Sequence, residues 1–435
     1  SGDMAFLVKN AKTLSSYRSL DENRFLRGGA MVVGLGGWNL LTFYSKKQQD
    51  ATLVLDSLSG EWSASSVSTS GLHRTTSELR NKNSMNETIK GGYLSFENSR
   101  FHLGVSSVAQ FYDIPLIPTD RIYNRFDFRG RGTVNSGVDY RLYLQNFAFF
   151  GESVVMQETL KSAHLHGAMW SADPRLSLSL VYRRFDKSFH SFYANAIGEG
   201  SQVKNEEGWL MSANVQLNKT WKLQLYADCF EHQGMKFLVN GPSYGQEYFA
   251  QLEAKPNKKN NLYLRYTEEN KQKNARLEEV DFIPLEWVNK KRIRFQYSFK
   301  VNESFTLRNR VEWVKVTRLS NDDENGILLY QDLLYRPKSF PVDLSLRYAI
   351  FDTDSYDSRV YAYENHVLNV FSVPAYYYQG DKIIAMMRYS LRRNLDVWLR
   401  YSRVLYANRK SISSGNEEID GPVKSEITLQ LRWRF

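Results

Sequence analysis

The chain has 435 residues, a net charge of +10 and a mean hydropathy of -0.49, and aromatic residues make up 14% of it. The low hydropathy and the absence of any run of about 18 apolar residues exclude a helical membrane protein. A single cysteine, Cys229, excludes an intramolecular disulfide framework. These features are also typical of a transmembrane β-barrel, in which only alternate residues of each strand face lipid.

The N-terminal residues Ser1, Gly2 and Asp3 do not have the features of a signal peptide. We therefore expect the chain to be the C-terminal part of a longer precursor.

Along the chain, predicted strands recur in pairs. The two strands of each pair are joined by a tight turn made of residues that favour turns. The turns lie near Gly36-Gly37, Asn98, Asn146, Asp173-Pro174, Asn218, 256–260, Asn302, Pro337 and Asn394. Between the pairs lie longer polar stretches, at about 47–90, 112–130, 186–207, 231–245, 268–288, 320–325, 352–367 and 407–423. Because outer-membrane barrels have short periplasmic turns and long extracellular loops, this asymmetry predicts a periplasmic C-terminus.

Within the pairs, apolar and polar residues alternate. Leu344, Leu346 and Tyr348, for example, alternate with Ser345 and Arg347. The pattern predicts an all-β fold, a transmembrane antiparallel β-barrel with about 18–20 strands in this chain, forming one domain over residues 1–435. A soluble sandwich or propeller would also alternate, but it would leave the asymmetry of the turns unexplained.

The last strand has a strict alternation that ends on an aromatic residue. Leu429, Leu431, Trp433 and Phe435 share one face. Such an ending resembles outer-membrane barrel proteins, in which the final strand carries the assembly signal. The resemblance implies the outer membrane of a Gram-negative cell, with lipid, lipopolysaccharide and the barrel-assembly machinery as partners.

Arginine dominates the polar side of the predicted strands. The positions are Arg265, Arg308, Arg310, Arg347, Arg388, Arg400, Arg432 and Arg434. They predict a cationic lumen that favours anions. The alternative is that they pair with Asp228, Glu312, Asp343 and Asp396 in ladders that only stiffen the wall.

Support for catalysis or metal binding is weak. His164 and His166 are spaced to share a strand face, but no further ligand completes a metal site. The segment 352–357 is rich in aspartate but lacks the glycine and closing glutamate of a calcium loop. No nucleophile, base and orienting acid stand out. We therefore expect no enzyme activity, no metal and no cofactor.

Four segments, 19–27, 70–75, 351–365 and 419–426, resemble the large barrel of Bacteroidota outer-membrane proteins known as helix-hairpin-helix or competence-type (ComEA-like) DNA-binding proteins. In that family a signal peptide, a helix-hairpin-helix region and the first barrel strands precede the part that corresponds to Ser1. The resemblance implies that N-terminal strands and the helix-hairpin-helix region are missing here, and that DNA uptake is a candidate role.

Two functions follow from these features. The first is transport of an anionic substrate through a cationic lumen, with nucleic acid as a candidate partner by resemblance. The second is a non-conducting structural subunit of an outer-membrane assembly, secretion or uptake complex, with other outer-membrane or periplasmic proteins as partners.

Overall fold

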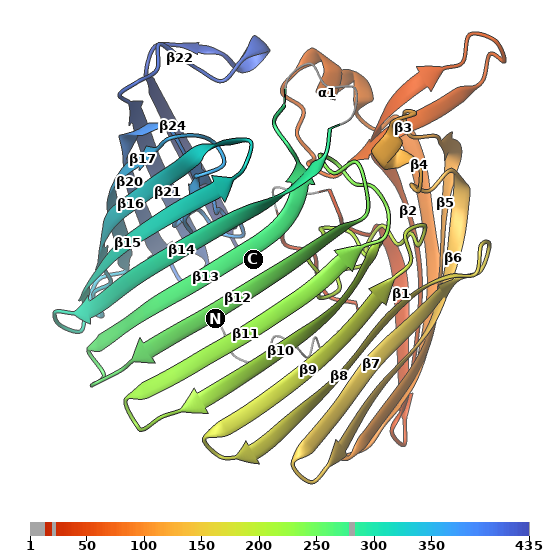
Figure 1. The fold of residues 1–435 in the computed structure, drawn as a ribbon, viewed down its shortest axis with the longest axis horizontal. Coiled ribbons are helices and arrows are strands. Elements are labelled where there is room, and N and C mark those ends of the chain that lie inside the picture. Colours follow the sequence, from red (N-terminus) through yellow and green to blue (C-terminus); the bar gives the residue numbers. More distant parts are fainter. Residues whose placement is uncertain (1–13, 20–22, 278–282, 435) are drawn as a thin grey trace. The chain divides into compact units, whose positions relative to one another are not determined.

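The structure is a computed structural model that describes residues 14–19, 23–277 and 283–434 (Figure 1). In these residues one sheet contains 20 strands, antiparallel except for a single parallel bridge between β3 and β5, and two further sheets have two strands each. The predicted all-β antiparallel barrel fold, with about 18–20 strands, is confirmed. In the same residues, no helix has both the length and the apolar character needed to cross a membrane.

The strands of the large sheet follow one another along the chain. They are β1 (Gly28–Leu35), β2 (Trp38–Leu55), β3 (Trp62–Ser68), β4 (Met85–Glu97), β5 (Phe101–Leu116), β6 (Gly130–Leu144), β7 (Phe147–Met156), β8 (Lys161–Asp173), β9 (Leu176–Phe185), β10 (Glu206–Gln216), β11 (Trp221–His232), β12 (Ser243–Ala254), β13 (Asn260–Asn274), β14 (Leu285–Lys300), β15 (Phe305–Arg318), β16 (Asn321–Tyr335), β17 (Val342–Thr353), β20 (Gln379–Arg392), β21 (Leu395–Tyr406) and β24 (Val423–Trp433). Short elements occupy the connections: α1 (Thr76–Asn81), η2 (Ile122–Asn124), β18 (Val360–Tyr361), β19 (Ala375–Tyr376), β22 (Ser411–Ile412), η3 (Gly415–Glu417) and β23 (Ile419–Asp420).

The chain divides into two compact units. Unit 1 comprises Ser1–Asn214, Tyr226–Gln246 and Lys271–Leu285, and unit 2 comprises Val215–Leu225, Glu247–Asn270 and Glu286–Phe435. The prediction of a single domain is not tested by this division and stays a prediction.

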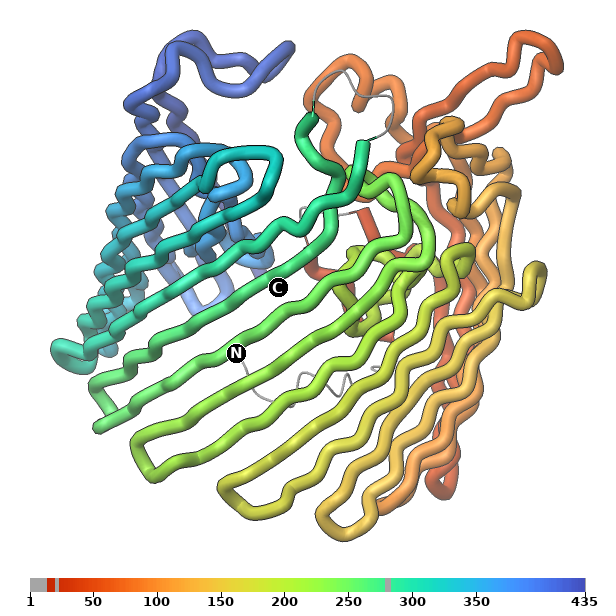
Figure 2. The backbone as a smooth tube through the Cα atoms, in the orientation of Figure 1, coloured from red at the N-terminus to blue at the C-terminus, as the bar shows by residue number. Residues whose placement is uncertain are grey.

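In unit 1 some neighbouring strands are joined by tight turns, as Figure 1 shows for β7, β8 and β9, whereas others, such as β9 and β10, are joined by long connections. At the turn between β1 and β2, Gly36 and Gly37 both have positive φ, at 57° and 88°. Glycine suits this two-residue turn because it adopts positive φ without steric cost. The β2 strand is long: it pairs first with β4 and then with β3. Figure 2 shows this β2–β3 hairpin as a red-to-orange arm.

The sheet of unit 2 has the same hairpin arrangement, with β14 to β17, β20, β21 and β24 paired in sequence order. Its two faces differ sharply. Leu344, Leu346 and Tyr348 on β17 are 39–48% exposed, whereas Ser345 and Arg347 between them are buried. We call the two sides of the sheet the apolar face and the polar face. Apolar residues point outward and charged residues point inward, which is the reverse of a water-soluble protein.

Two of the predicted loops are wrong in their extent. Much of residues 47–90 is strand, because β2 runs to Leu55 and β3 follows it. Residues 321–325 lie within β16, where Asn325 pairs with Lys315. In both places polar residues occupy both sides of the strand, so the alternation that marks membrane-facing strands is absent although the backbone pairing continues.

Candidate functional site

The candidate site is the polar face of unit 2. Seven of the eight arginines singled out in the sequence lie on strands β13, β15, β17, β20, β21 and β24. The eighth, Arg434, directly follows β24. The side chains of the alternate residues Arg308 and Arg310 both pair with carboxylates of this face. These arginines come from strands that are far apart in sequence, and the regular register of the sheet brings them together.

The first cluster centres on Asp332 of β16. The guanidinium group of Arg347 donates two hydrogen bonds to its carboxylate, at 2.6 and 2.8 Å. Arg308 approaches the same carboxylate from the other neighbouring strand, at 3.5 Å. Asp332 lies opposite both arginines in the strand register, so cross-strand pairing alone places the three charges in one row.

A second cluster lies on β14 and β15. Arg294 donates two hydrogen bonds to the carboxylate of Glu312, at 2.8 and 3.0 Å, and Arg310 also pairs with Glu312. The Arg265 side chain differs, because its Nε donates to the neutral Oε1 of Gln251 at 2.8 Å. In the part of the chain that the structure describes, Arg265 has no ion pair with a carboxylate.

The third cluster is the densest. Asp396 accepts hydrogen bonds from Arg388 at 3.2 Å, from Arg432 at 2.5 and 3.1 Å, and from Arg434 at 3.2 Å. Arg388 also reaches Asp343 at 3.3 Å. Across the three clusters, seven guanidinium groups therefore share four carboxylates. The arginines therefore form rows of ion pairs across the strands, as the alternative interpretation predicted. The positive charges in these clusters still outnumber the negative charges.

The connection between β17 and β20, which we call loop 354–378, lies against the same face. Its Val360, Ala362 and Tyr376 are buried in an apolar cluster with Ala349 and Phe351 of β17. The sequence predicted a polar loop at about 352–367, and the segment does connect two strands, but part of it packs on the sheet. Alternating small and apolar residues give its strand pair β18–β19 one side that packs on the wall.

Charged groups fix the loop in place. Glu364 of the loop accepts hydrogen bonds from Arg400 at 2.8 Å and from Lys382 at 2.5 Å, and all three side chains are largely buried. Arg347 donates to the carbonyl oxygen of Tyr363 at 2.6 Å. The arginines of the wall thus bind the loop as well as one another.

Unit 1 holds a buried ion-pair cluster that the sequence analysis did not single out. Arg183 of β9 is fully buried and bonds to Glu206 at 2.5 Å and to Asp228 at 2.8 and 3.1 Å. Asp228, expected to pair with one of the eight arginines, pairs with Arg183 instead. The alternation of β9 already placed Arg183 on its polar side, so a signal was present.

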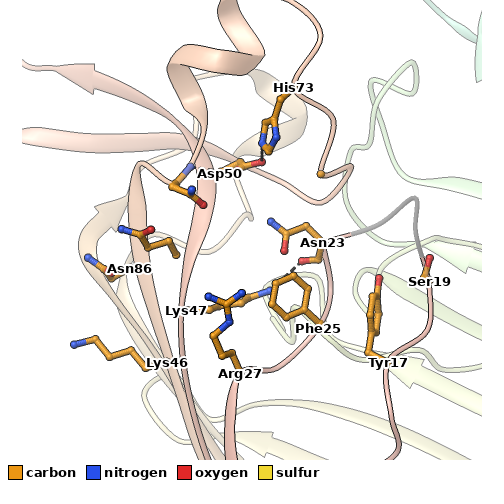
Figure 3. Close-up of a pocket in the computed structure, with 13 residues that line it drawn as sticks. Tyr17, Ser19, Asn23, Phe25, Arg27, Lys46, Lys47, Asp50, His73 and Asn86 are labelled. Carbon is orange, nitrogen blue, oxygen red and sulfur yellow. Dashed lines mark hydrogen bonds and ion pairs between the residues drawn. The ribbon is translucent and has the colours of Figure 1, made fainter. Parts of the chain in front are cut away.

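Unit 1 also contains a cavity of about 670 Å³ beside the β2 strand (Figure 3). Its wall combines rings and cations: the Nζ of Lys47 lies 4.5 Å from the ring centre of Phe25, and the guanidinium carbon of Arg27 lies 5.6 Å from it. At its other end His73 bonds to Asp50 at 2.7 Å. The cavity is polar and carries positive charge, as the polar face of unit 2 does.

The residues expected to carry the assembly signal lie on the final strand. Leu429, Leu431 and Trp433 are on the apolar face and are 63–68% exposed, whereas Phe435 lies outside the described residues. The rings of His164 and His166 each bond to hydroxyl groups of neighbouring residues. In the described residues, no group of three or more His, Cys, Asp or Glu side chains could hold a metal ion.

Comparisons with known proteins show similarity only to solved structures. No protein-family model matches the chain, and no curated protein matches it. The resemblance to helix-hairpin-helix, competence-type proteins of Bacteroidota therefore gains no support from them.

The similar solved structures are outer-membrane proteins. OmpT of Vibrio cholerae is 11% identical, with a TM-score of 0.38, and covers 82% of this chain and 99% of its own. The FrpB iron transporter of Neisseria meningitidis is 10% identical, with a TM-score of 0.46, over 94% of this chain and 71% of its own. A BenF-like porin of Pseudomonas fluorescens is 11% identical, with a TM-score of 0.39, over 82% of this chain and 89% of its own.

Proposed function

We propose that this chain forms an outer-membrane β-barrel that lets small hydrophilic anions cross, with its C-terminus in the periplasm. The observation that carries the proposal is the polar face of unit 2, where seven guanidinium groups share four carboxylates. Excess positive charge on a surface that lines water raises the local concentration of anions. The apolar face opposite it is suited to lipid.

Loop 354–378 supports a selective rather than a wide pathway. It occupies part of the polar face, and Glu364 and the carbonyl oxygen of Tyr363 bind the arginines that would otherwise face solvent. A loop held in this way narrows the water-filled space beside the wall. We therefore infer a restricted path for small solutes. DNA, which the resemblance to competence-type proteins implies, is the larger alternative substrate.

The test is conductance in planar lipid bilayers with a potassium chloride gradient. We expect discrete channels whose reversal potential has the sign of a chloride preference. The Arg265→Gln variant should reduce that preference roughly twofold, because Arg265 has no carboxylate partner in the described residues. Arg175→Gln, at an exposed tight turn, is the matched control. Cation preference in the wild-type protein would contradict the proposal.

The second candidate function is a non-conducting structural subunit of an outer-membrane complex. The buried contacts of loop 354–378 favour it, because a firmly docked loop also closes a path. Wild-type protein that inserts into bilayers without conductance, and that is recovered from membranes with a stoichiometric protein partner, would support this candidate. Lipopolysaccharide and the barrel-assembly machinery are proposed partners under either function.

A further inference from the structure

A second cavity lies within unit 1, between its sheet and the connection from β9 to β10, which we call loop 186–205. Its volume is about 320 Å³. Most of its lining is apolar, with Ile89, Val154 and Leu165 from the sheet and Phe189 and Phe192 from the loop. Cavities of this size with apolar walls and a few polar groups are the usual form of small-molecule sites.

Five polar residues of the sheet also line the cavity, and the carboxylate among them is that of Glu152; the others are Ser106, Gln110, Asn135 and His164. Glu152 of β7 lines the cavity and is exposed to it. Within the described residues Glu152 makes no hydrogen bond and no ion pair. Asp139 lies directly opposite it on β6, so two like charges face each other across neighbouring strands. Such a pair is destabilising unless a positive charge lies nearby.

Asp139 is already bound, whereas Glu152 is not. The carboxylate of Asp139 is 2.9 Å from Nε2 of His102 and accepts a hydrogen bond from the hydroxyl group of Tyr93 at 3.2 Å. The charge that lacks compensation is therefore that of Glu152, and it faces the cavity.

The loop side of the cavity is aromatic. Phe189 is almost completely buried, and the rings of Phe192 and Tyr193 stand edge to face with centres 5.2 Å apart. Aromatic faces attract cations electrostatically, and clusters of such rings recognise ammonium groups. The cavity thus presents a carboxylate on one wall and aromatic rings on the other.

The loop is tethered to the sheet, so these walls are preorganised. The hydroxyl group of Tyr193 donates to Glu87 at 2.7 Å, and the side-chain amide of Asn135 donates to the carbonyl oxygen of His190 at 3.1 Å. A wall that is already ordered loses little entropy when a ligand binds.

From this geometry we propose that the cavity binds a small organic ammonium ion with an apolar body, its cationic group beside Glu152 and its body against Phe189 and Phe192. An organic anion is unsuited, because Glu152 and Asp139 would repel it. A bare metal ion is unsuited as well, because most of the remaining wall is apolar and the described residues form no cluster of metal ligands. The proposal does not depend on the proposed channel function.

The experiment is saturation-transfer NMR of benzyltrimethylammonium with the full chain in detergent. We expect saturable binding to the wild-type protein, with benzoate, of similar size but opposite charge, binding at least about tenfold more weakly, a difference of about 1.4 kcal/mol. Glu152→Gln should weaken ammonium binding by a similar factor. Phe192→Leu should weaken it too, because an apolar side chain remains but the ring is lost.

Glu61→Gln, an exposed carboxylate near the β2–β3 turn, is the control for non-specific attraction and for partition into micelles. Equal binding of the ammonium ion and benzoate, an unchanged affinity in Glu152→Gln, or no binding to the wild-type protein would each overturn the proposal. Gel mobility with and without heating shows whether each variant is folded. Bilayer conductance of the same samples is a separate readout, so failure of this proposal is distinguishable from failure of the channel function.

Discussion

Arg400 on β21 and Glu364 in loop 354–378 form a buried ion pair at 2.8 Å that joins the loop to the wall. Lys382 on the neighbouring strand binds the same carboxylate. Two cations of the sheet therefore share one acid of the loop, and Arg400 also lies 3.4 Å from the carboxylate of Glu426 on β24. Removing that acid takes from buried Lys382 the carboxylate that it binds and leaves Arg400 with the longer contact to Glu426, which is more costly than losing an exposed pair.

We predict that Glu364→Gln releases loop 354–378 from the polar face. Breaking a buried pair by removing one partner costs about 3–5 kcal/mol, so the released form should become well populated. Single-channel conductance should rise, and amide hydrogen exchange of residues 354–378 should accelerate. Glu418→Gln, an exposed carboxylate outside the loop, should change neither. Unchanged conductance and exchange in Glu364→Gln would show that the apolar contacts alone hold the loop.

A second prediction separates buried from exposed ion pairs in unit 2. Arg347 binds Asp332 through two hydrogen bonds and is almost fully buried, whereas the side chains of Lys338 and Glu303 are 77% and 76% exposed. Arg347→Ala should lower the free energy of unfolding by about 3–5 kcal/mol. Lys338→Ala should lower it by at most about 1 kcal/mol.

Thermal unfolding in detergent, followed by tryptophan fluorescence, measures both changes. Arg347→Lys should lie between the wild type and the alanine variant, because lysine keeps the charge but cannot form the two parallel hydrogen bonds. If Arg347→Ala and Lys338→Ala lowered the free energy of unfolding by equally small amounts, burial would not explain why the ion pairs of the polar face stabilise the protein.

Features of the fold and of the candidate site were predictable from the sequence where they depend on residues close together in the chain. The alternation around Arg347 predicts a strand and the side on which the arginine lies, because that information is local. The shared partner Asp332 follows only once strand register is known. The contact between Glu364 and Arg400 joins loop 354–378 to strand β21, which is not adjacent to the loop in sequence. No local pattern in residues 354–378 indicates on which surface the loop packs.

A third prediction concerns pH and loop 186–205 in unit 1. Burial, with a contribution from Lys204, lowers the pKa of His190 from 6.5 to about 4, while Asp127 acts in the opposite direction. The docked conformation of loop 186–205 is therefore more stable when His190 is neutral than when it is protonated. Its stability is fully present above pH 6.5 and is lost as the pH falls from 6.5 towards 4, because the released histidine binds a proton more readily. At pH 5 the loss is about 2 kcal/mol.

Hydrogen exchange of residues 186–205 at pH 7 and pH 5, corrected for intrinsic rates, measures this loss. The wild-type loop should open more often at pH 5. His190→Gln should remove most of the difference, because glutamine does not titrate. His73→Gln, in another part of unit 1, should keep it. A loop with equal protection at both pH values would contradict the prediction.

The final prediction tests which face of the sheet meets lipid. Leu399 on β21 lies opposite Leu429 on β24, and both belong to the apolar face, while Thr428 on β24 points to the polar face. An arginine at the bilayer midplane on the lipid side of a barrel costs about 2–4 kcal/mol, whereas an arginine on the water side costs little. We therefore expect Leu399→Arg to destabilise the protein folded into lipid vesicles by that amount. Thr428→Arg places an arginine opposite Arg400, so it should cost something as well, but at most about 1 kcal/mol. Denaturant titrations in vesicles give both values.

If the two substitutions had equal effects, or if Thr428→Arg were the more damaging, the apolar face would not be the lipid-facing side, and the arginines could not line a water-filled path.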